Sequence, residues 1–341
     1  MIEDLIRKNI KALSPYSSAR DEFTQVAEVY LDANENPYEN NLNRYPDPYQ
    51  KKVKKLLSSW KGISTSKMML GNGSDEVLDL IFRVFCEPKE DNVVLLPPTY
   101  GMYNVLANIN NIETTEIGLN DDFSPNVDVI LKAQNNNSKV LFVCSPNNPT
   151  ANVFNISKVE KLLNNFKGIV VIDEAYIDFA DSESWIKRLD EFPNLIVTQT
   201  FSKALGHAGI RLGVAYASEE IIEVLNNIKP PYNVNELTQQ KAIEVLEEAK
   251  FTKQIEVIKE EREKLNSALK ELSYVKEIFP SDANFILIRV DDANSIYNQL
   301  LEKGIVVRNR STQFKCENTL RISVGTPEEN EILIDTMNNL Q

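Results

Sequence analysis

Short apolar runs alternate with amphipathic segments between Met68 and Ser218. The runs are rich in Val, Ile and Leu without polar alternation, and they read KMML, NVVLLP, KVLFVC, GIVVID, NLIVTQ and RLGVAYA. Strands with this pattern are buried on both faces of a sheet. Segments with apolar residues at helical spacing, such as SDEVLDLIFRVF, lie between them. The pattern predicts an α/β fold with a mostly parallel sheet.

The pattern changes after Pro230 and Pro231. A long, charged helical region follows from Asn235 to about Leu272, and then come NFILIRV, GIVVRNR and TLRISVG. A helical segment, DANSIYNQLLEKG, separates the first two of these runs. We therefore expect a large domain over residues 30–250. A smaller α+β domain is expected to combine 251–341 with the N-terminal segment 1–29, which has little periodicity.

Composition excludes several classes of function. The net charge of −13 over 341 residues argues against a nucleic-acid partner. No apolar run is long enough to span a bilayer, and the first residues lack the apolar core of a signal peptide, so a cytoplasmic protein is expected. The three cysteines form no CxxC pair, so neither a disulfide framework nor a structural metal site is expected. His207 is the only histidine, which excludes a zinc site with several His ligands.

Polar motifs stand where the predicted strands end. These are GNGSDE, PPTYGMY, SPNNPT, Asp173 with Tyr176, and Lys203 followed by Arg211 in TFSKALGHAGIRLG. Each motif alone has a structural explanation: a capped turn, a core tyrosine, a rigid loop, a capping aspartate or a surface lysine. Together they supply what pyridoxal 5′-phosphate requires: a lysine for its aldehyde, a carboxylate for its ring nitrogen, an aromatic ring and phosphate donors.

The chain resembles the fold-type I, pyridoxal-phosphate-dependent aminotransferases along nearly its whole length. SPNNPT, VIDEAY and FSKALGHAGIRLG carry this resemblance, whereas LDANENP, NRYPDP and PTYGMY resemble the histidinol-phosphate aminotransferases in particular. The resemblance implies that Lys203 binds the cofactor covalently and moves a proton, and that Asp173 pairs with the ring nitrogen. It also implies a homodimer, because Tyr45 matches a tyrosine that reaches the cofactor phosphate of the neighbouring subunit.

Further roles follow from the same resemblance. Asn148 and Tyr176 are expected at the phenolic oxygen of the cofactor, and Tyr100 on its ring. The expected phosphate ligands are Gly73, Ser74, Asp75, Ser202 and Arg211, and the expected substrate-binding residues are Tyr16, Asn34, Arg308 and Arg321.

Three further positions lie in or near these motifs. Ala151 stands where relatives usually have glycine, which raises a question about the geometry of that loop. His207 is interpreted as a packed or solvated side chain rather than a catalytic group. Arg310 could add to the positive charge that Arg321 and Arg308 offer to the acidic group of the substrate, but we favour its interpretation as a solvated residue of the loop RNRSTQ.

The implied activity is transamination between histidinol phosphate and 2-oxoglutarate or glutamate, in histidine biosynthesis. An aminotransferase for aromatic or other amino acids is an alternative on the same scaffold. A pyridoxal-phosphate-dependent lyase or decarboxylase, such as one acting on threonine phosphate, is another. A regulatory domain that only binds the cofactor is disfavoured, because no DNA-binding segment is visible and the arginines are present.

Overall fold

The computed structural model of this protein describes residues 2–14 and 28–340. Within them, seven strands form the larger sheet in the order β1-β7-β6-β5-β4-β2-β3. The strands are β1 (Met68–Asn72), β2 (Asn92–Leu95), β3 (Glu113–Glu116), β4 (Ser138–Cys144), β5 (Ile169–Asp173), β6 (Leu195–Thr200) and β7 (Leu212–Ala217). Of these described strands, only β7 runs opposite to the other six, so the sheet is mostly parallel as predicted.

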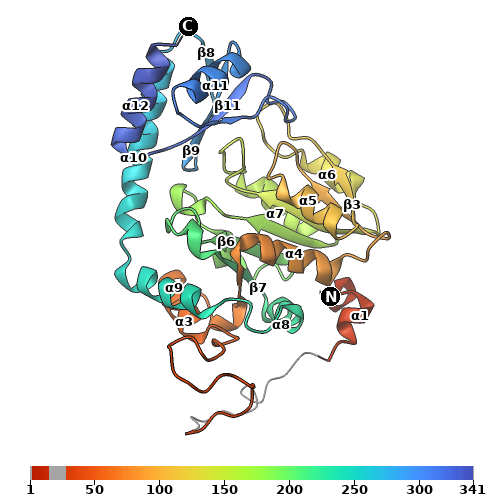
Figure 1. Ribbon diagram of the computed structural model, residues 1–341. Coiled ribbons are helices and arrows are strands. Elements are labelled where there is room, and N and C mark those ends of the chain that lie inside the picture. The colour runs from red at the N-terminus through yellow and green to blue at the C-terminus, as the bar shows by residue number, and fades with distance from the viewer. Residues whose placement is uncertain (1, 15–27, 341) are drawn as a thin grey trace.

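Helices cover both faces of this sheet (Figure 1). They are α3 (Lys51–Lys61), α4 (Gly73–Phe85), α5 (Met102–Ile109), α6 (Val127–Ala133), α7 (Ile156–Asn165), α8 (Glu219–Ile228) and α9 (Glu236–Glu248). Successive strand residues pack into opposite cores: Val170 and Ile172 face one, and Ile169 and Val171 face the other. This double burial explains the uninterrupted apolar runs of the sequence.

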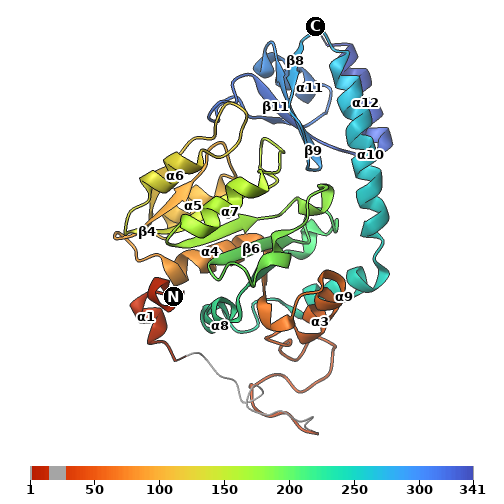
Figure 2. The same cartoon turned by 180° about the vertical axis from the view of Figure 1, so that it is seen from behind.

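A smaller unit follows at the C-terminal end. It contains α10 (Phe251–Lys270), β8 (Val275–Ile278), β9 (Phe285–Val290), α11 (Ala293–Glu302), β10 (Arg308–Asn309), β11 (Thr319–Ser323) and α12 (Pro327–Asn338). Its strands form an antiparallel sheet in the order β10-β11-β9-β8. Helix α10 runs along one side of the molecule and connects the two units (Figure 2). In agreement, Ile255 near its start packs in a core of the large unit and Leu265 in that of the small unit.

Two elements differ from the sequence-based expectation. The helical region after Asn235 is broken, because α9 ends at Glu248 and the following Ala249 adopts the left-handed conformation (φ 48°). Helix α10 then starts toward the small unit. Strand β3, with the sequence ETTE, was not expected. It lies at the edge of the sheet with no buried residue, so it lacks the apolar pattern of the inner strands.

The N-terminal residues lie beside the large unit. The short helices η1 (Ile2–Leu5) and α1 (Lys8–Lys11) come first, and Ile2 and Ile6 pack into the core that α4 shares. The backbone N–H of Arg7 donates to the carbonyl of Val84 over 3.0 Å. The expected domain boundaries stay a prediction, but this packing puts residues 2–7 against the large unit rather than the C-terminal one. Within the described residues, no helix has both the length and the apolar character needed to cross a membrane.

Candidate active site

The candidate site lies at one edge of the large sheet. Strands β1, β2, β4, β5 and β6 end there, and β7 begins there because it runs antiparallel. Ligands of α/β proteins bind at this edge. A cavity of about 160 Å³ opens at it, lined by Ser74, Asp75, Tyr100, Cys144, Asn148, Asp173, Ala175, Tyr176, Thr200, Ser202, Lys203, Ala208 and Arg211.

Asp173 forms the buried floor of the cavity. It is the last residue of β5, and its side chain accepts hydrogen bonds from the hydroxyl of Tyr103 (2.7 Å) and the backbone N–H of Ala175 (3.2 Å). Burial raises the pKa of this carboxyl, while these hydrogen bonds act in the opposite direction. A buried carboxylate with neutral partners provides a site for a ligand N–H that carries positive charge.

Lys203 follows β6 and enters the same cavity. Its Nζ lies 5.5 Å from the centroid of the Tyr176 ring. Burial lowers the pKa of the amine most, and the positive charge of Arg321 lowers it further, while Asp173 opposes the shift. A lowered pKa leaves more of the amine neutral near physiological pH, which is the form that attacks an aldehyde or accepts a proton.

Asn148 and Tyr176 connect the cavity to the small unit. Nδ2 of Asn148 donates to the hydroxyl of Tyr176 over 3.4 Å, and Oδ1 accepts from Nη1 of Arg321 over 2.6 Å. Arg321 lies on β11 of the small sheet. The neutral amide therefore holds the guanidinium of a distant segment beside the cavity.

The start of α4 forms one wall of the cavity. The helix begins at Gly73, so the N–H groups of its first turn have no partner within the helix and can bind an anion. A Cβ atom at Gly213 would lie 2.3 Å from the backbone nitrogen of Ser74, so only glycine lets β7 approach this turn so closely. A Cβ at Gly73 would lie 2.6 Å from Nη2 of Arg211.

Polar side chains surround this turn. Arg211 Nη1 donates to the hydroxyl of Ser202 (3.4 Å), and Nη2 lies 3.7 Å from Oδ2 of Asp75. The hydroxyl of Tyr100 donates to Oδ1 of Asp75 (3.1 Å). A helix N-terminus, a hydroxyl and a guanidinium thus converge, as a phosphate group requires.

Among the described residues, five of those expected in the site do not line this cavity. Gly73 precedes the lining residue Ser74, and Arg321 contacts the lining residue Asn148; the other three are Arg308, Asn34 and Tyr45. Tyr16 lies outside the described residues. Arg308 is exposed at the start of β10, opposite Arg321 on β11. Asn34 is exposed in the segment 28–50, which extends beyond the large unit (Figure 1). Tyr45 belongs to the same segment and is half exposed.

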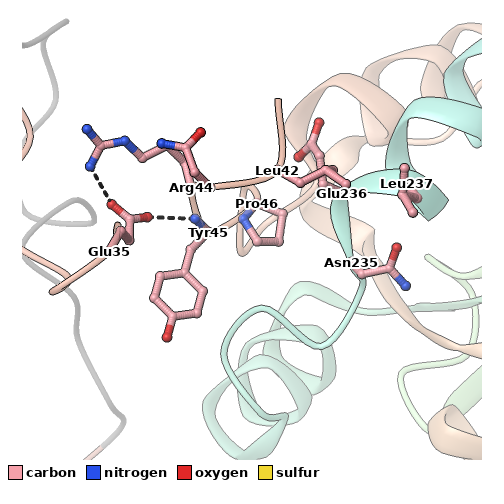
Figure 3. A pocket seen from close by; sticks show the side chains of 9 residues that line it. Glu35, Leu42, Arg44, Tyr45, Pro46, Asn235, Glu236 and Leu237 are labelled. Atoms are coloured by element: carbon pink, nitrogen blue, oxygen red, sulfur yellow. Dashed lines mark hydrogen bonds and ion pairs between the residues drawn. The ribbon is translucent and has the colours of Figure 1, made fainter. Parts of the chain in front are cut away.

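Tyr45 lines a second, more open pocket with α9. Its backbone N–H donates to Oε1 of Glu35 (2.6 Å), whose other oxygen pairs with Arg44 (Figure 3). Its ring stacks on that of Tyr232, with 4.5 Å between centroids. Glu35 therefore fixes the backbone of Tyr45, and Tyr232 supports its ring.

The structure also brings in residues that the sequence did not indicate. Tyr103 lies on α5, three residues after Tyr100, and its hydroxyl reaches Asp173. The spacing of the two tyrosines in PTYGMY is compatible with this contact. Cys144, Ala175, Thr200 and Ala208 line the cavity, and each stands directly beside or near a predicted site residue. The closeness of these residues in sequence to a motif at a strand end is therefore the signal that could have identified them.

Arg310 follows β10 and lies in the loop as interpreted, but its side chain is not fully solvated. Its side chain is half-buried, and its Nε is buried without a hydrogen-bond partner. Its backbone N–H donates to the carbonyl of Thr319 (2.9 Å), which draws the residue onto the small sheet. The pairing with β11 therefore extends beyond the two residues of β10. The polar sequence RNRSTQ gives no indication of this pairing.

Ala151 and His207 both lie in structural positions. Ala151 is buried and adopts a φ of 66°, the left-handed region where glycine is preferred, so the turn is kept at a cost of about 1 kcal/mol. The Nδ1 of His207 lies at hydrogen-bond distance from the carbonyl of Leu205. His207 does not line the cavity.

The residues present fit the expected cofactor. Asp173 offers a negative charge to a ring nitrogen, Lys203 an amine to an aldehyde, and the start of α4 an anion site to a phosphate. Within the described residues, no group of three or more His, Cys, Asp and Glu side chains is placed to hold a metal ion.

Comparison with known proteins places this geometry in a family. The model of class I and II aminotransferases matches residues 15–337. The chain belongs to this family. It is 59% identical to the histidinol-phosphate aminotransferase of Flavobacterium johnsoniae, over 98% of this chain and 97% of that protein. It is 60% identical to the enzyme of the same name from Christiangramia forsetii, over 100% of this chain and 98% of that protein.

A solved structure shares the fold. The histidinol-phosphate aminotransferase of Sinorhizobium meliloti, in complex with pyridoxal 5′-phosphate, superimposes with a TM-score of 0.79. The two are 22% identical, and the match covers 87% of this chain and 84% of that one. At this identity the similarity demonstrates the fold alone. This fold is the one expected from the resemblance to the fold-type I aminotransferases.

Proposed function

We propose that the chain is a pyridoxal-phosphate-dependent aminotransferase that exchanges an amino group between histidinol phosphate and 2-oxoglutarate, as a step of histidine biosynthesis. The contact between Arg321 and Asn148 carries this proposal, because it holds an arginine suited to an acidic substrate group beside the lysine cavity. The identity of 59% and 60% with relatives named for this activity supports the choice of substrate.

The cofactor would be held by residues of the cavity. Lys203 would bind it covalently, Asp173 would pair with its ring nitrogen, and Tyr100 would cover its ring. Its phenolic oxygen would contact Asn148 and Tyr176, and its phosphate would be bound by Gly73, Ser74, Asp75, Ser202 and Arg211. When bound, pyridoxal phosphate supplies an electron-withdrawing ring that stabilises the charge left when a substrate carbon loses a proton.

Lys203 would act as the base. Burial and the charge of Arg321 lower the pKa of its amine, which favours the neutral form that removes a proton from the α carbon of the substrate. Asp173 would face the ring nitrogen from a buried position, in which the hydroxyl of Tyr103 donates a hydrogen bond to its carboxyl. Arg321 and Arg308 would bind the acidic group of the substrate, because a guanidinium fork suits carboxylate and phosphate alike.

We also propose that the enzyme is a homodimer. The segment 28–50 and α9 expose apolar side chains, including Leu31 (86% exposed), Tyr38 (82%) and Leu237 (60%). Exposed aromatic and apolar groups in one area are typical of protein interfaces. Tyr45 and Asn34 lie in this segment, away from the cavity of their own chain, and would contribute to the site of the partner subunit. The three buried, unpaired cysteines suit a reducing compartment, and we place the enzyme in the cytoplasm.

A donor panel tests the reaction. The purified holoenzyme is mixed with 2-oxoglutarate and with histidinol phosphate, an aromatic amino acid or threonine phosphate, and the glutamate formed is measured. We expect histidinol phosphate to give the highest kcat/KM. A higher value for the aromatic amino acid would favour the alternative aminotransferase. Release of carbon dioxide from threonine phosphate without glutamate would identify a decarboxylase instead.

A further inference from the structure

Three arginines share one face of the small sheet. Arg308 on β10 pairs directly opposite Arg321 on β11, and opposite residues of an antiparallel pair project to the same side. Arg310 lies two residues after Arg308 and continues this pairing, because its backbone N–H donates to the carbonyl of Thr319. Because alternate residues of a strand share a face, Arg310 lies on the side of Arg308 and Arg321. We call this set the arginine face.

The arginine face has no acidic partner among the described residues. Nη1 of Arg321 donates to the neutral amide of Asn148, and the Nε atoms of both Arg310 and Arg321 are buried without a hydrogen-bond partner. In contrast, Arg289 of the same sheet pairs with Glu277 over 3.3 Å. Like charges opposite one another and unpaired buried donors both destabilise a fold, so a bound anion would relieve both.

Arg310 lies close enough to Arg321, Arg308 and Tyr176 for the charge of each to act on it. Burial, then the charges of Arg321 and Arg308, lower the pKa of Arg310 to about 10, while Tyr176 acts in the opposite direction. Tyr176 lines the cavity with Lys203. At neutral pH the guanidinium stays charged, so it contributes a full positive charge near the wall of the cavity.

We propose that Arg310 determines specificity for a phosphate monoester, by binding the second negative charge of the substrate phosphate. This proposal rests on the proposed function and deepens it. The resemblance to the family gives roles to Arg308 and Arg321 but none to Arg310. A carboxylate carries one charge and is satisfied by one guanidinium fork, whereas a phosphate monoester carries nearly two charges at neutral pH on three oxygens.

The two substrates of one enzyme provide the test. In Arg310→Gln, kcat/KM for histidinol phosphate should fall roughly 10- to 100-fold, the effect of losing a charge-assisted hydrogen bond. The value for glutamate should change less than about threefold, because its carboxylate keeps Arg321. Arg310→Lys keeps the charge without the fork and should lie between. Lys303→Gln removes an exposed charge of the small unit and serves as the control.

The pH dependence separates charge recognition from a structural defect. The second ionisation of a phosphate monoester lies near pH 6. In the wild type, kcat/KM for histidinol phosphate should rise as the pH increases through this value, since the dianion binds best. In Arg310→Gln this rise should shrink, whereas a variant that is only destabilised would keep its shape.

Equilibrium binding tests the same point without catalysis. Propyl phosphate and butyrate, which lack an amino group, are titrated into the holoenzyme by calorimetry. Arg310→Gln should weaken propyl phosphate by the same factor as kcat/KM and leave butyrate unchanged. Equal losses for both ligands, or none for either, would overturn the role of Arg310. A wild type that binds propyl phosphate but forms no product from histidinol phosphate would instead contradict the proposed function.

Discussion

The hydroxyl of Tyr103 donates a hydrogen bond to Oδ2 of Asp173, with 2.7 Å between the oxygens. Tyr103 is fully buried, its ring stacks on Phe142 (4.8 Å between centroids) and its edge meets Tyr100 (5.5 Å). The packing leaves the phenol no freedom to turn away from the carboxylate. Tyr103 is therefore a positioning residue, which acts on the cofactor through Asp173.

Replacing Tyr103 by Phe should move the acid limb of the activity profile. Burial already raises the pKa of Asp173 and the Tyr103 bond lowers it, so removing the hydroxyl raises the pKa further. Half-maximal kcat should therefore appear at a higher pH than in the wild type. Tyr274→Phe removes a hydroxyl that bonds the carbonyl of Met337 in the small unit, and serves as the control. An unshifted acid limb in Tyr103→Phe would show that the bond does not tune Asp173.

Close packing at the phosphate turn yields a prediction about two glycines. In Gly213→Ala the new methyl group would lie 2.3 Å from the backbone nitrogen of Ser74, so the start of α4 must move. We expect a loss of about 1–3 kcal/mol in the free energy of unfolding and a weaker affinity for pyridoxal phosphate. Urea unfolding of the apoenzyme and equilibrium titration with the cofactor measure the two effects.

Gly209 provides the matched control. No heavy atom lies within 4 Å of a Cβ built at this position. Gly209→Ala should therefore leave both stability and cofactor affinity within about 0.5 kcal/mol of the wild type. Equal effects of the two substitutions would mean that flexibility of the loop, rather than the approach of β7 to α4, is what the glycines provide.

Much of the fold could be predicted because the inner strands are buried on both faces. Ile169–Asp173 is an apolar run that ends in a carboxylate, and this pattern located both β5 and its functional residue. The sequence could not reveal β3, whose edge position imposes no apolar residues. Nor did it reveal where α10 begins, because nothing in the charged helical pattern indicates that Ala249 is left-handed.

The candidate site was predictable where a residue follows a strand, and poorly predictable where pairing creates it. Asp173 is the last residue of a strand of the large sheet, Asn148 and Lys203 follow such strands, and all three line one cavity. Arg310 joins the arginine face only through its pairing with Thr319 on the next strand, which lies nine residues away in sequence. Single-sequence patterns contain no information on such partners, so a polar loop was the natural interpretation.

The charge of Arg321 should be detectable at Lys203. After burial, Arg321 contributes most to lowering the pKa of this amine, so Arg321→Gln should raise that pKa. The apoenzyme reacts with pyridoxal phosphate through the neutral amine, and the pH at which this reaction reaches half its maximal rate should therefore increase. Absorbance after mixing follows the reaction between pH 6 and 10, with Arg289→Gln as a control that removes an arginine of the same sheet.

Arg321→Gln should also affect both substrates, in contrast to Arg310→Gln. Its guanidinium is the one bonded to Asn148, and it would bind carboxylate and phosphate alike. We expect kcat/KM to fall at least roughly 100-fold for histidinol phosphate and for glutamate. Loss with histidinol phosphate alone would assign the common acid-binding role to another residue.

Mixed dimers can determine which subunit each site residue serves. If Tyr45 contributes to the partner's cavity, a dimer of one Lys203→Ala and one Tyr45→Ala subunit contains one intact site and one site with both defects. Such a hybrid should recover about half of the wild-type activity, although neither parent homodimer is fully active. The subunits carry different affinity tags, and the doubly tagged fraction is isolated before the glutamate formed is measured.

A second hybrid makes this result specific to Tyr45. Asp173 and Lys203 line the same cavity of one chain, so a dimer of Lys203→Ala and Asp173→Asn subunits has one defect in each site. This hybrid should show no recovery. Recovery in neither hybrid would place Tyr45 in the cavity of its own chain. That requires the segment 28–50 to move from the position where the ring of Tyr45 stacks on Tyr232. Recovery in the first hybrid alone is what a shared, dimeric active site predicts.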